Sequence, residues 1–395
     1  MQKHWPTIIF LWLIGVLAAA QLAKFSTIAP LLRDRFDLSL PEAGLLISLL
    51  EVGGGLFGFV AGMALSWINY RRSLLAGVAI LAATSLLEAS VASSAMLFAA
   101  RAVEGIGYLL VVIAAPTAIA AIADDRNRAR ALALWSSFVP VGIAVGSGVT
   151  SLGVASLGAH GIMVLRAAVL AVTIVPLLRL RLRTGDTDSR RIVLPAPAAW
   201  VSTFAFGVYT LFLCALTMLL PTFLMVERAA ALNEAGLVAS VASLSALPAS
   251  GLAILLIRRG QLSTGRLLMI AIPALVGTAL LVPLALGRSS DLATTSTLVV
   301  GAVLLSGLVS PLMFARLPIL AGAESSHDPR IATANGLLTQ FGAGGALIGP
   351  PLGGLVADGW GWTALGAVIA GLALLMLAGV ALSEWITARS SPVGA

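Results

Sequence analysis

Charged side chains are scarce in this sequence of 395 residues, because only 10% are Asp, Glu, Lys or Arg. Soluble domains carry about 25% charged residues, so this scarcity excludes an ordinary water-soluble protein. Lysine is rarer still, since Lys3 and Lys24 are the only two in the chain. The single cysteine, Cys214, can form no intrachain disulfide, which excludes a disulfide-stapled secreted scaffold.

Apolar residues dominate the sequence: 59% of the residues are hydrophobic, and the mean hydropathy is +1.03. This balance is typical of integral membrane proteins. The net charge of +7 does not indicate a nucleic-acid partner, because the arginines cluster in short loops between apolar runs, as in cytoplasmic loops of membrane proteins. We expect the lipid bilayer and a small-molecule substrate as partners, and no nucleic acid.

A membrane-spanning helix needs about 20 mostly apolar residues, and the sequence contains twelve such runs. They cover residues 7–31, 41–66, 73–92, 95–121, 130–154, 161–179, 198–224, 233–257, 266–286, 295–319, 331–356 and 363–386. The first run lies in a stretch, residues 5–32, that is too long for a cleaved signal peptide, so we expect a retained first helix.

The longest connecting loop follows the sixth run and divides the chain into two similar halves. We therefore predict an all-α integral membrane fold with 12 transmembrane helices in two pseudo-symmetric six-helix bundles. The N-terminal bundle covers residues 1–180, a cytoplasmic linker covers 181–197, and the C-terminal bundle covers 198–395.

The lysines and arginines predict the orientation of these helices. With both termini inside, 17 of the 24 Lys and Arg residues fall on the inner side and 6 on the outer side, while Lys24 lies within a span. Positive residues are enriched in cytoplasmic loops. The pattern predicts a multi-pass protein of the bacterial inner (cytoplasmic) membrane with both termini in the cytoplasm.

The two halves also share a sequence repeat, found when the chain is compared with itself at an offset of 203 residues. In each copy, a turn with acidic and basic residues precedes a helix that carries two glycines four residues apart. The matching pairs are Asp125 with Asp328, Phe138 with Phe341, Gly142 with Gly345, and Gly146 with Gly349. Chance alignment of apolar sequence is the alternative. Two parallel six-helix halves are one plan of secondary transporters.

Ionisable residues inside the predicted spans are the candidates for chemistry, because each costs at least ~2.5–3.5 kcal/mol at the centre of a bilayer. They are Lys24, Glu51, Glu88, Arg101, Glu104 and Arg166. Counted from the span centres at 1.5 Å per residue, Lys24 in the first span, Glu51 in the second, and Arg101 and Glu104 in the fourth lie at one level in the outer half of the membrane. We predict a charge network there, with Lys24 paired to Glu51 or Glu104.

Local spacing supports this network, because residues three apart share a helix face. Gln21 lies on the face of Lys24, and Arg101 on the face of Glu104. Burial disfavours an ionised carboxylate and a nearby cation favours it, so such a group can take up or release a proton as its neighbours move. Glu51 and Glu104 are the predicted proton carriers.

Static ion pairs that only hold helices together are the alternative for each of these residues. Glu88 and Arg166 lie close enough to the outer interface for their side chains to reach it. We therefore do not expect either of them in the site.

The second half contains no carboxylate at the middle of a predicted span. Its candidates for substrate binding are Tyr209, Phe212 and Gln340, because aromatic groups with polar tips can line a solute pocket. Simple helix packing is the alternative. From the first half, Lys24, Gln21, Arg101 and Tyr108 are the substrate-binding candidates. We expect coupling in the first half and substrate recognition in the second.

Small residues and prolines mark the predicted sites of gating and helix packing. Glycines let helix backbones approach closely in membranes, and prolines can kink helices. The candidates are Gly142, Gly146, Gly349, Gly353 and Pro350.

The sequence shows no metal-ligand cluster, no nucleophile–base arrangement and no phosphate-binding GxxxxGK loop. We therefore expect that the protein is not an enzyme and binds no cofactor. A proton is the expected coupling ion.

Two segments carry a family resemblance. LFAARAVEGIG (97–107) resembles the fourth-helix signature of the major facilitator superfamily, with Arg101 and Glu104 followed by two glycines. GMALSWINYRR (62–72) resembles the superfamily's turn between helices two and three, and retains Gly62, Arg71 and Arg72. The turn carries Ser66 where the usual residue is Asp.

The resemblance implies a twelve-helix transporter in which Arg101 has a role in proton coupling or charge balance. Residues 101–121 look most like the bacterial cyanate and nitroimidazole transporter branch. A GPxxGG pattern, which this superfamily's antiporters carry in helix five, occurs instead at residues 349–354.

We therefore predict a secondary active transporter that moves a small organic solute, anionic or polar, by alternating access and proton coupling. Proton-driven export of a drug or metabolite is an alternative within the same fold. A non-transporting membrane sensor is an alternative of another class, although the chain has no long loop for a signalling domain. We expect a monomer, because this architecture can work as one.

Overall fold

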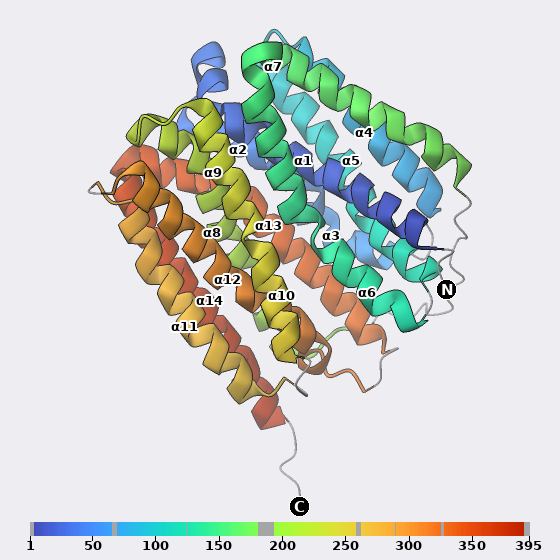
Figure 1. Cartoon of the computed structure of the whole chain (residues 1–395). Helices are drawn as coiled ribbons and strands as arrows, with labels where there is room; N and C mark the ends of the chain where they lie inside the picture. The colour runs from blue at the N-terminus through green and yellow to red at the C-terminus, as the bar shows by residue number, and fades with distance from the viewer. Residues whose placement is uncertain are drawn as a thin grey trace, which may run out of the picture. The chain divides into compact units, whose positions relative to one another are not determined.

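The computed structural model describes residues 4–64, 69–123, 125–180, 193–257, 262–288, 290–324 and 328–390, and all regular elements in these ranges are helices (Figure 1). The first are α1 (Trp5–Phe36), α2 (Leu40–Ser48), the 3-10 turn η1 (Leu49–Glu51), α3 (Val52–Ala64), α4 (Tyr70–Ala89), α5 (Ser94–Ile122), α6 (Asp125–Ser136) and α7 (Phe138–Arg179). The others are α8 (Pro197–Glu227), α9 (Leu232–Leu244), α10 (Ala246–Ile257), α11 (Thr264–Ala285), α12 (Leu292–Leu320), α13 (Pro329–Trp360) and α14 (Trp362–Ser390).

Capping side chains determine where several of these helices begin. The side chains of Asn69, Ser93, Ser263 and Asp291 each accept a hydrogen bond from a backbone N–H in the first turn of α4, α5, α11 and α12, respectively. Such caps satisfy N–H groups that have no partner within the helix. The apolar runs between the caps then supply the helix length.

Ten helices among the described residues are long and apolar enough to span a membrane. One of them, Arg130–Arg179, contains the predicted spans 130–154 and 161–179, and its backbone leaves the helical region at Gly158 (φ 66°). The predicted span 331–356 lies in α13, which is not among the ten. The count of twelve thus stays a prediction, while the all-helical fold is confirmed for the described residues.

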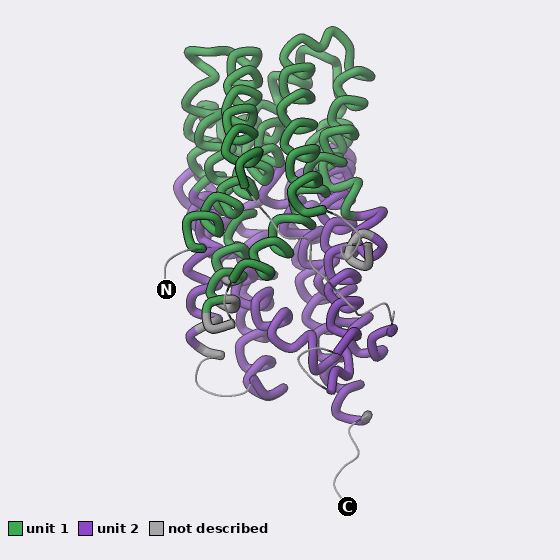
Figure 2. The backbone as a smooth tube through the Cα atoms, turned by 90° about the vertical axis from the view of Figure 1, so that its right-hand side faces the viewer, with its two compact units in different colours: residues 1–54, 64–188, 220–240 green, residues 55–63, 189–219, 241–395 purple. Residues whose placement is uncertain are grey.

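The chain forms two compact units, coloured separately in Figure 2. Unit 1 contains Met1–Gly54, Ala64–Asp188 and Leu220–Ser240, and unit 2 contains Gly55–Met63, Ser189–Leu219 and Val241–Ala395. The predicted division at residues 181–197 stays a prediction, and residues 181–192 lie outside the described ranges.

Within unit 1, α1 packs on α7 at two glycines. A Cβ added to Gly142 would lie 2.6 Å from the carbonyl oxygen of Val16, and one added to Gly146 would lie 2.5 Å from that of Ala20. Real side chains do not approach backbone so closely, so only glycine permits this helix distance.

Within unit 2, α13 packs on α8 in the same way. A Cβ added to Gly345 would collide with the carbonyl oxygen of Gly207, and one added to Gly349 with that of Leu211. Gly345 and Gly349 are the repeat partners of Gly142 and Gly146. The predicted repeat is therefore visible in the helix packing of each unit.

Candidate functional site

The two largest fully buried side chains among the described residues are both cations, Arg101 and Lys24. Lys24 projects from the middle of α1, and Arg101 from the first third of α5. Both belong to unit 1, where α1, α4, α5 and α7 pack around an apolar core. Buried charges of this kind persist only when they are paired.

Lys24 is shared between two carboxylates. Its Nζ donates to Glu104 Oε1 at 2.6 Å and to Glu88 Oε2, and all three side chains are fully buried. The same ammonium lies 3.5 Å from Ser85 Oγ and 5.0 Å from the centre of the Phe25 ring. Lys24 therefore joins α1 to both α4 and α5.

Arg101 completes the arrangement on α5. Its Nη1 donates to Glu104 Oε2 at 2.7 Å, while its Nε and Nη2 donate to the carbonyl oxygens of Leu46 and Ile47 at 3.1 and 2.8 Å. These two carbonyls lie in the last turn of α2, just before the 3-10 turn η1. Glu104 is thus held by a cation on each of its oxygens.

Glu88 has fewer hydrogen-bond partners than Glu104. Lys24 binds its Oε2, whereas Oε1 has no hydrogen-bond partner among the residues that the structure describes. A buried carboxylate oxygen without a partner is costly. The two glutamates of the cluster therefore differ: both oxygens of Glu104 are occupied, and one oxygen of Glu88 is open.

Arg166 of α7 forms the other wall of the cluster. Its guanidinium donates to the carbonyl oxygens of Ala20 and Gly146, at 2.9 and 2.8 Å, and to Thr150 Oγ1 at 2.7 Å. These bonds lie at the close crossing of α1 and α7. We call Lys24, Glu88, Arg101, Glu104 and Arg166 the charge cluster.

The remaining predicted residues of the first half border this cluster. Glu51 lies in η1, half-buried, and interacts with the Tyr108 hydroxyl and electrostatically with Arg101. Gln21 is buried, donates to the Leu17 carbonyl oxygen at 3.3 Å and accepts from Ser85 Oγ at 3.5 Å. Since Ser85 also contacts Lys24, Gln21 reaches the cluster through one hydroxyl.

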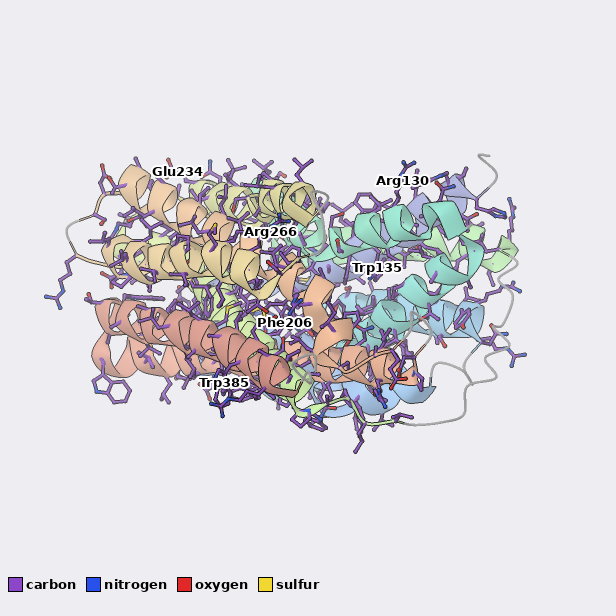
Figure 3. The ribbon with its side chains drawn as sticks, turned by 90° about the horizontal axis from the view of Figure 1, so that it is seen from below. Arg130, Trp135, Phe206, Glu234, Arg266 and Trp385 are labelled. Atoms are coloured by element: carbon purple, nitrogen blue, oxygen red, sulfur yellow. The ribbon has the colours of Figure 1, made fainter. Side chains whose placement is uncertain are left out.

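The predicted substrate-binding residues of the second half lie in unit 2. Tyr209 and Phe212 are buried in α8, with ring centres 5.6 Å apart. The ring centre of Phe206, which Figure 3 labels, lies 5.8 Å from that of Tyr209. Gln340 of α13 accepts the backbone N–H of Phe59 at 3.2 Å. These contacts are those of helix packing.

The predicted gating residues occupy several places. Arg71 donates to the carbonyl oxygen of Leu178, and Arg72 N–H donates to the cap side chain of Asn69. Gly353 and Pro350 are buried in α13. Gly62 lies in α3, but its surroundings, like Ser66, fall outside the described residues.

Lys24 pairs with Glu104, one of its two predicted alternative partners, and also with Glu88. The structure corrects the expectation that Glu88 and Arg166 lie outside the site. Glu88 and Arg166 do not reach outward to an interface, because both are buried in unit 1.

The error on Glu88 came from placing residues by the centres of straight spans. Glu88 lies one residue before the end of α4, whereas α1 continues for twelve residues beyond Lys24, so the two helices are not level at their ends. A local signal was present: Thr84, Ser85 and Glu88 lie three and four residues apart and give α4 one polar face. For Arg166 no local spacing gave a signal, because it follows the break at Gly158 and bonds back to Gly146 and Thr150, which precede that break.

No group of His, Cys, Asp and Glu suited to a metal occurs among the described residues. The arrangement supports proton exchange and electrostatic attraction of anions, both of which the buried carboxylates and cations can provide.

Comparisons with known proteins agree with this fold. The family model described as Major Facilitator Superfamily matches residues 11–326. The crystal structure of a bacterial homologue of the human lysosomal transporter Spinster, in an inward-facing and occupied conformation, has a TM-score of 0.72 at 19% identity, covering 99% of this chain and 98% of that one. A second such structure, inward-facing and unoccupied, has a TM-score of 0.67 at 18% identity, with coverage of 98% and 96%.

None of the curated proteins compared with the chain matches it. The structural likeness at such low identity establishes the fold, and the family model covers most of the sequence. Because this family model matches residues 11–326, the chain belongs to the Major Facilitator Superfamily.

Proposed function

We propose that this protein is a proton-coupled secondary transporter of a small organic anion or strongly polar solute. The observation that carries the proposal is the charge cluster, in which five ionisable side chains are buried within one unit. A buried ion pair is often no more stabilising than apolar residues of similar volume. The cluster is therefore better explained by function than by packing.

The composition of the cluster favours an anion. Lys24, Arg101 and Arg166 carry three positive charges, while Glu88 and Glu104 carry two negative charges when both are ionised. Protonation of one carboxylate leaves a further positive charge without a counter-ion. An anionic solute that binds in concert with the proton would restore the balance, which is the physical requirement for coupling the two.

The positions of the carboxylates suggest which of them exchanges a proton. Glu104 is bound by Lys24 and Arg101, which stabilise its ionised form. Glu51 and Glu88 have fewer cationic partners among the described residues. We therefore move the proposed proton carrier from Glu104 to Glu88, and retain Glu51 as a candidate.

We further propose that the protein resides in the bacterial inner membrane as a monomer, with both termini in the cytoplasm. The support is the excess of Lys and Arg on one side of the predicted spans, 17 against 6.

A ligand screen by thermal shift tests the proposal on the purified full chain in detergent. Small organic anions, cations and neutral compounds are compared at neutral and acidic pH. We expect stabilisation by a subset of anions, stronger at acidic pH, and absent in Lys24→Ala. Binding stabilises by an amount that depends on ligand concentration over Kd, about 2.7 kcal/mol at a hundredfold excess.

Arg316→Ala is the matched control, because Arg316 forms the buried ion pair with Glu384 in unit 2. This variant should lose stability but keep the anion response. If cations or neutral compounds stabilise the protein equally in wild type and Lys24→Ala, the proposal of an anion transporter is wrong.

A further inference from the structure

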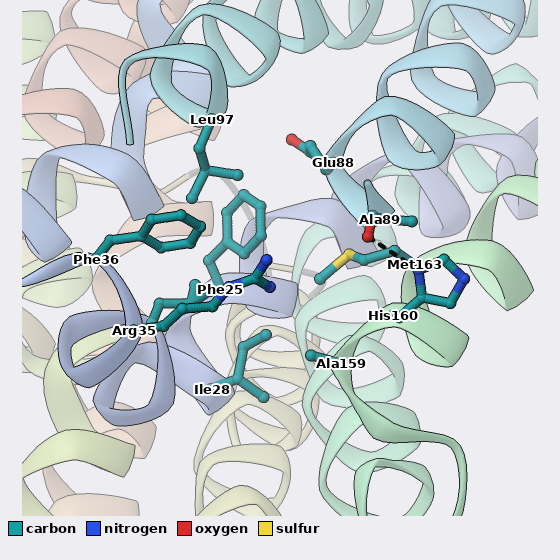
Figure 4. A pocket seen from close by; sticks show the side chains of 11 residues that line it. Phe25, Ile28, Arg35, Phe36, Glu88, Ala89, Leu97, Ala159, His160 and Met163 are labelled. Atoms are coloured by element: carbon teal, nitrogen blue, oxygen red, sulfur yellow. Dashed lines mark hydrogen bonds between the residues drawn. The ribbon is translucent and has the colours of Figure 1, made fainter. Parts of the chain in front are cut away.

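A small cavity lies inside unit 1 beside the charge cluster. Glu88 lines it from α4, Phe25 and Arg35 from α1, Leu97 from α5, and His160 from α7 (Figure 4). The cavity has a volume of about 20 Å3. One water needs roughly 10–15 Å3 measured in the same way, so the cavity can hold water and is too small for an organic solute.

The two ends of the cavity differ in exposure. At its inner end the Glu88 side chain is fully buried, and its Oε1 has no hydrogen-bond partner among the described residues. At its outer end Arg35 and His160 are both exposed. The cavity thus joins a buried, incompletely bonded carboxylate to the surface at one end of unit 1.

The rim residues are held away from Glu88 by other partners. Arg35 Nη2 donates to the Val91 carbonyl oxygen at 3.0 Å, and the guanidinium lies 4.9 Å from the centre of the Phe36 ring. The His160 ring lies with Nδ1 2.9 Å from the Ala89 carbonyl oxygen, to which its N–H donates (Figure 4). Neither side chain closes the cavity by pairing with the carboxylate.

We propose that this cavity holds water and is the route by which protons reach and leave Glu88 from the end of unit 1 that carries Arg35 and His160. A hydronium ion at the rim gives its proton through the water to Oε1, where an O–H bond forms and neutral water remains. Glu88 becomes a carboxylic acid, and its Oε2 still accepts from Lys24. The step reverses when the proton leaves.

The charged and titratable groups around Glu88 come from three helices. Lys24 and Arg35 lie on α1, Arg101 and Glu104 on α5, and His160 and Arg166 on α7. The cations disfavour a free hydronium ion inside the cavity, so transfer runs along hydrogen-bonded water rather than by diffusion of the ion. The apolar walls, such as Phe25 and Leu97, confine that water.

The inference rests on the proposed proton coupling, but its test needs no transported solute. Wild-type protein in nanodiscs is given a rapid step from neutral to acidic pH, and the carbonyl stretch of protonated carboxylic acids is followed by infrared spectroscopy. The part of the band that is missing in Glu88→Gln reports protonation of Glu88. We then block the cavity with a thiol-reactive methanethiosulfonate in the variant Ala159→Cys.

Ala159 lines the cavity and is partly exposed, so the small change to cysteine is compatible with folding and the added group fills the space. Ser156→Cys is the matched control, because Ser156 is exposed three residues before Ala159, on the other side of the break at Gly158, and does not line the cavity. Wild type, which has only Cys214, controls for the native thiol.

We expect the blocked Ala159→Cys protein to protonate Glu88 at least tenfold more slowly, to the same final amplitude, with recovery after reduction. Blocked Ser156→Cys and wild type should be unchanged. An unchanged rate in blocked Ala159→Cys overturns the proposed route, and so does the absence of any band that depends on Glu88. If wild-type protein shows the Glu88-dependent band but transports no solute, the proposed function is wrong while the proposed proton route stands.

Discussion

Unit 1 and unit 2 use the same helix crossings but bury different chemistry. In both, a helix with two glycines four residues apart packs on the carbonyl oxygens of a partner helix. The matching carbonyls are Val16 with Gly207 and Ala20 with Leu211. Counted from these pairs, the position of Lys24 in α1 corresponds to Ala215 in α8.

The other members of the charge cluster have apolar counterparts too. Helix caps align α4 with α11 through Asn69 and Ser263, and α5 with α12 through Ser93 and Asp291. The repeat of 203 residues aligns the second part of α7 with α14. The counterparts of Glu88, Arg101, Glu104 and Arg166 are Val282, Val299, Ala302 and Ile369, all buried.

The comparison shows that the helix packing does not require charge at these positions. Unit 2 buries small and branched apolar side chains where unit 1 buries five ionisable ones. Its own buried ion pair, Arg316 with Glu384, lies elsewhere, where α12 and α14 meet the start of α11. The charges of unit 1 are thus an addition to a shared scaffold.

The largest expected effect follows from removing one charge of the cluster. Lys24→Ala leaves Glu88 and Glu104 without their shared cation, and breaking a buried ion pair costs about 3–5 kcal/mol. Thermal unfolding in detergent measures the loss. The five-site variant with Met at positions 24, 101 and 166 and Leu at 88 and 104 should be more stable than the single variant. The reverse order would show that unit 1 needs its charges to fold.

The ion pair of unit 2 provides the next comparison. Glu384→Ala leaves Arg316 buried with only neutral partners, Thr264 and the Leu262 carbonyl oxygen. We expect a loss on the order of 3 kcal/mol, with proton uptake by the protein unchanged. A change of proton uptake in this variant would mean that titration is not confined to unit 1.

The equivalent glycines test whether the scaffold is shared. Gly146→Ala and Gly349→Ala each push a Cβ into a backbone carbonyl, and we expect losses of ~1–3 kcal/mol in both. Gly371 of α14 has open space around an added Cβ. Gly371→Ala should therefore gain ~0.4–1 kcal/mol. Unequal losses at Gly146 and Gly349 would argue against the equivalence of the two crossings.

The smallest effect concerns helix caps and pH. The N–H groups of Arg330 and Glu324 donate to the Asp328 carboxylate and hold its pKa below the usual value. Because the folded pKa is lower than the unfolded one, the stabilisation is present above the unfolded pKa and is lost as pH falls through the folded pKa. Asp328→Asn should lower the melting temperature slightly at neutral pH and not at strongly acidic pH.

Ser93 of unit 1 is the control for this prediction, because it caps α5 with a hydroxyl. The effect of Ser93→Ala should be independent of pH over the same range. A pH-dependent difference for Ser93→Ala would show that another group titrates.

Sequence patterns predicted much of this architecture. Apolar runs located the helices, and the spacing of Arg101 and Glu104 predicted their ion pair. The glycine repeat predicted the two equivalent crossings. The pairing of Lys24 with Glu88 could not be predicted, because it depends on the relative lengths and tilts of α1 and α4, which are set by packing rather than by local sequence.

The aromatic residues of the second half illustrate a different limit. Tyr209 and Phe212 satisfy the pattern of a solute pocket and that of a packed helix equally, and composition does not separate the two. Their edge-to-face contact within unit 2 is what a packed core provides. Their role in substrate binding stays a prediction.

A difference titration tests the central claim, that the charges added to unit 1 exchange protons. Proton uptake by the purified full chain between neutral and acidic pH is compared among wild type, the five-site variant, and a unit 2 variant with Arg316→Met and Glu384→Leu. We predict that wild type and the unit 2 variant take up equal numbers of protons, and the five-site variant fewer. Equal uptake by all three would contradict the claim and make the cluster a structural ion pair network.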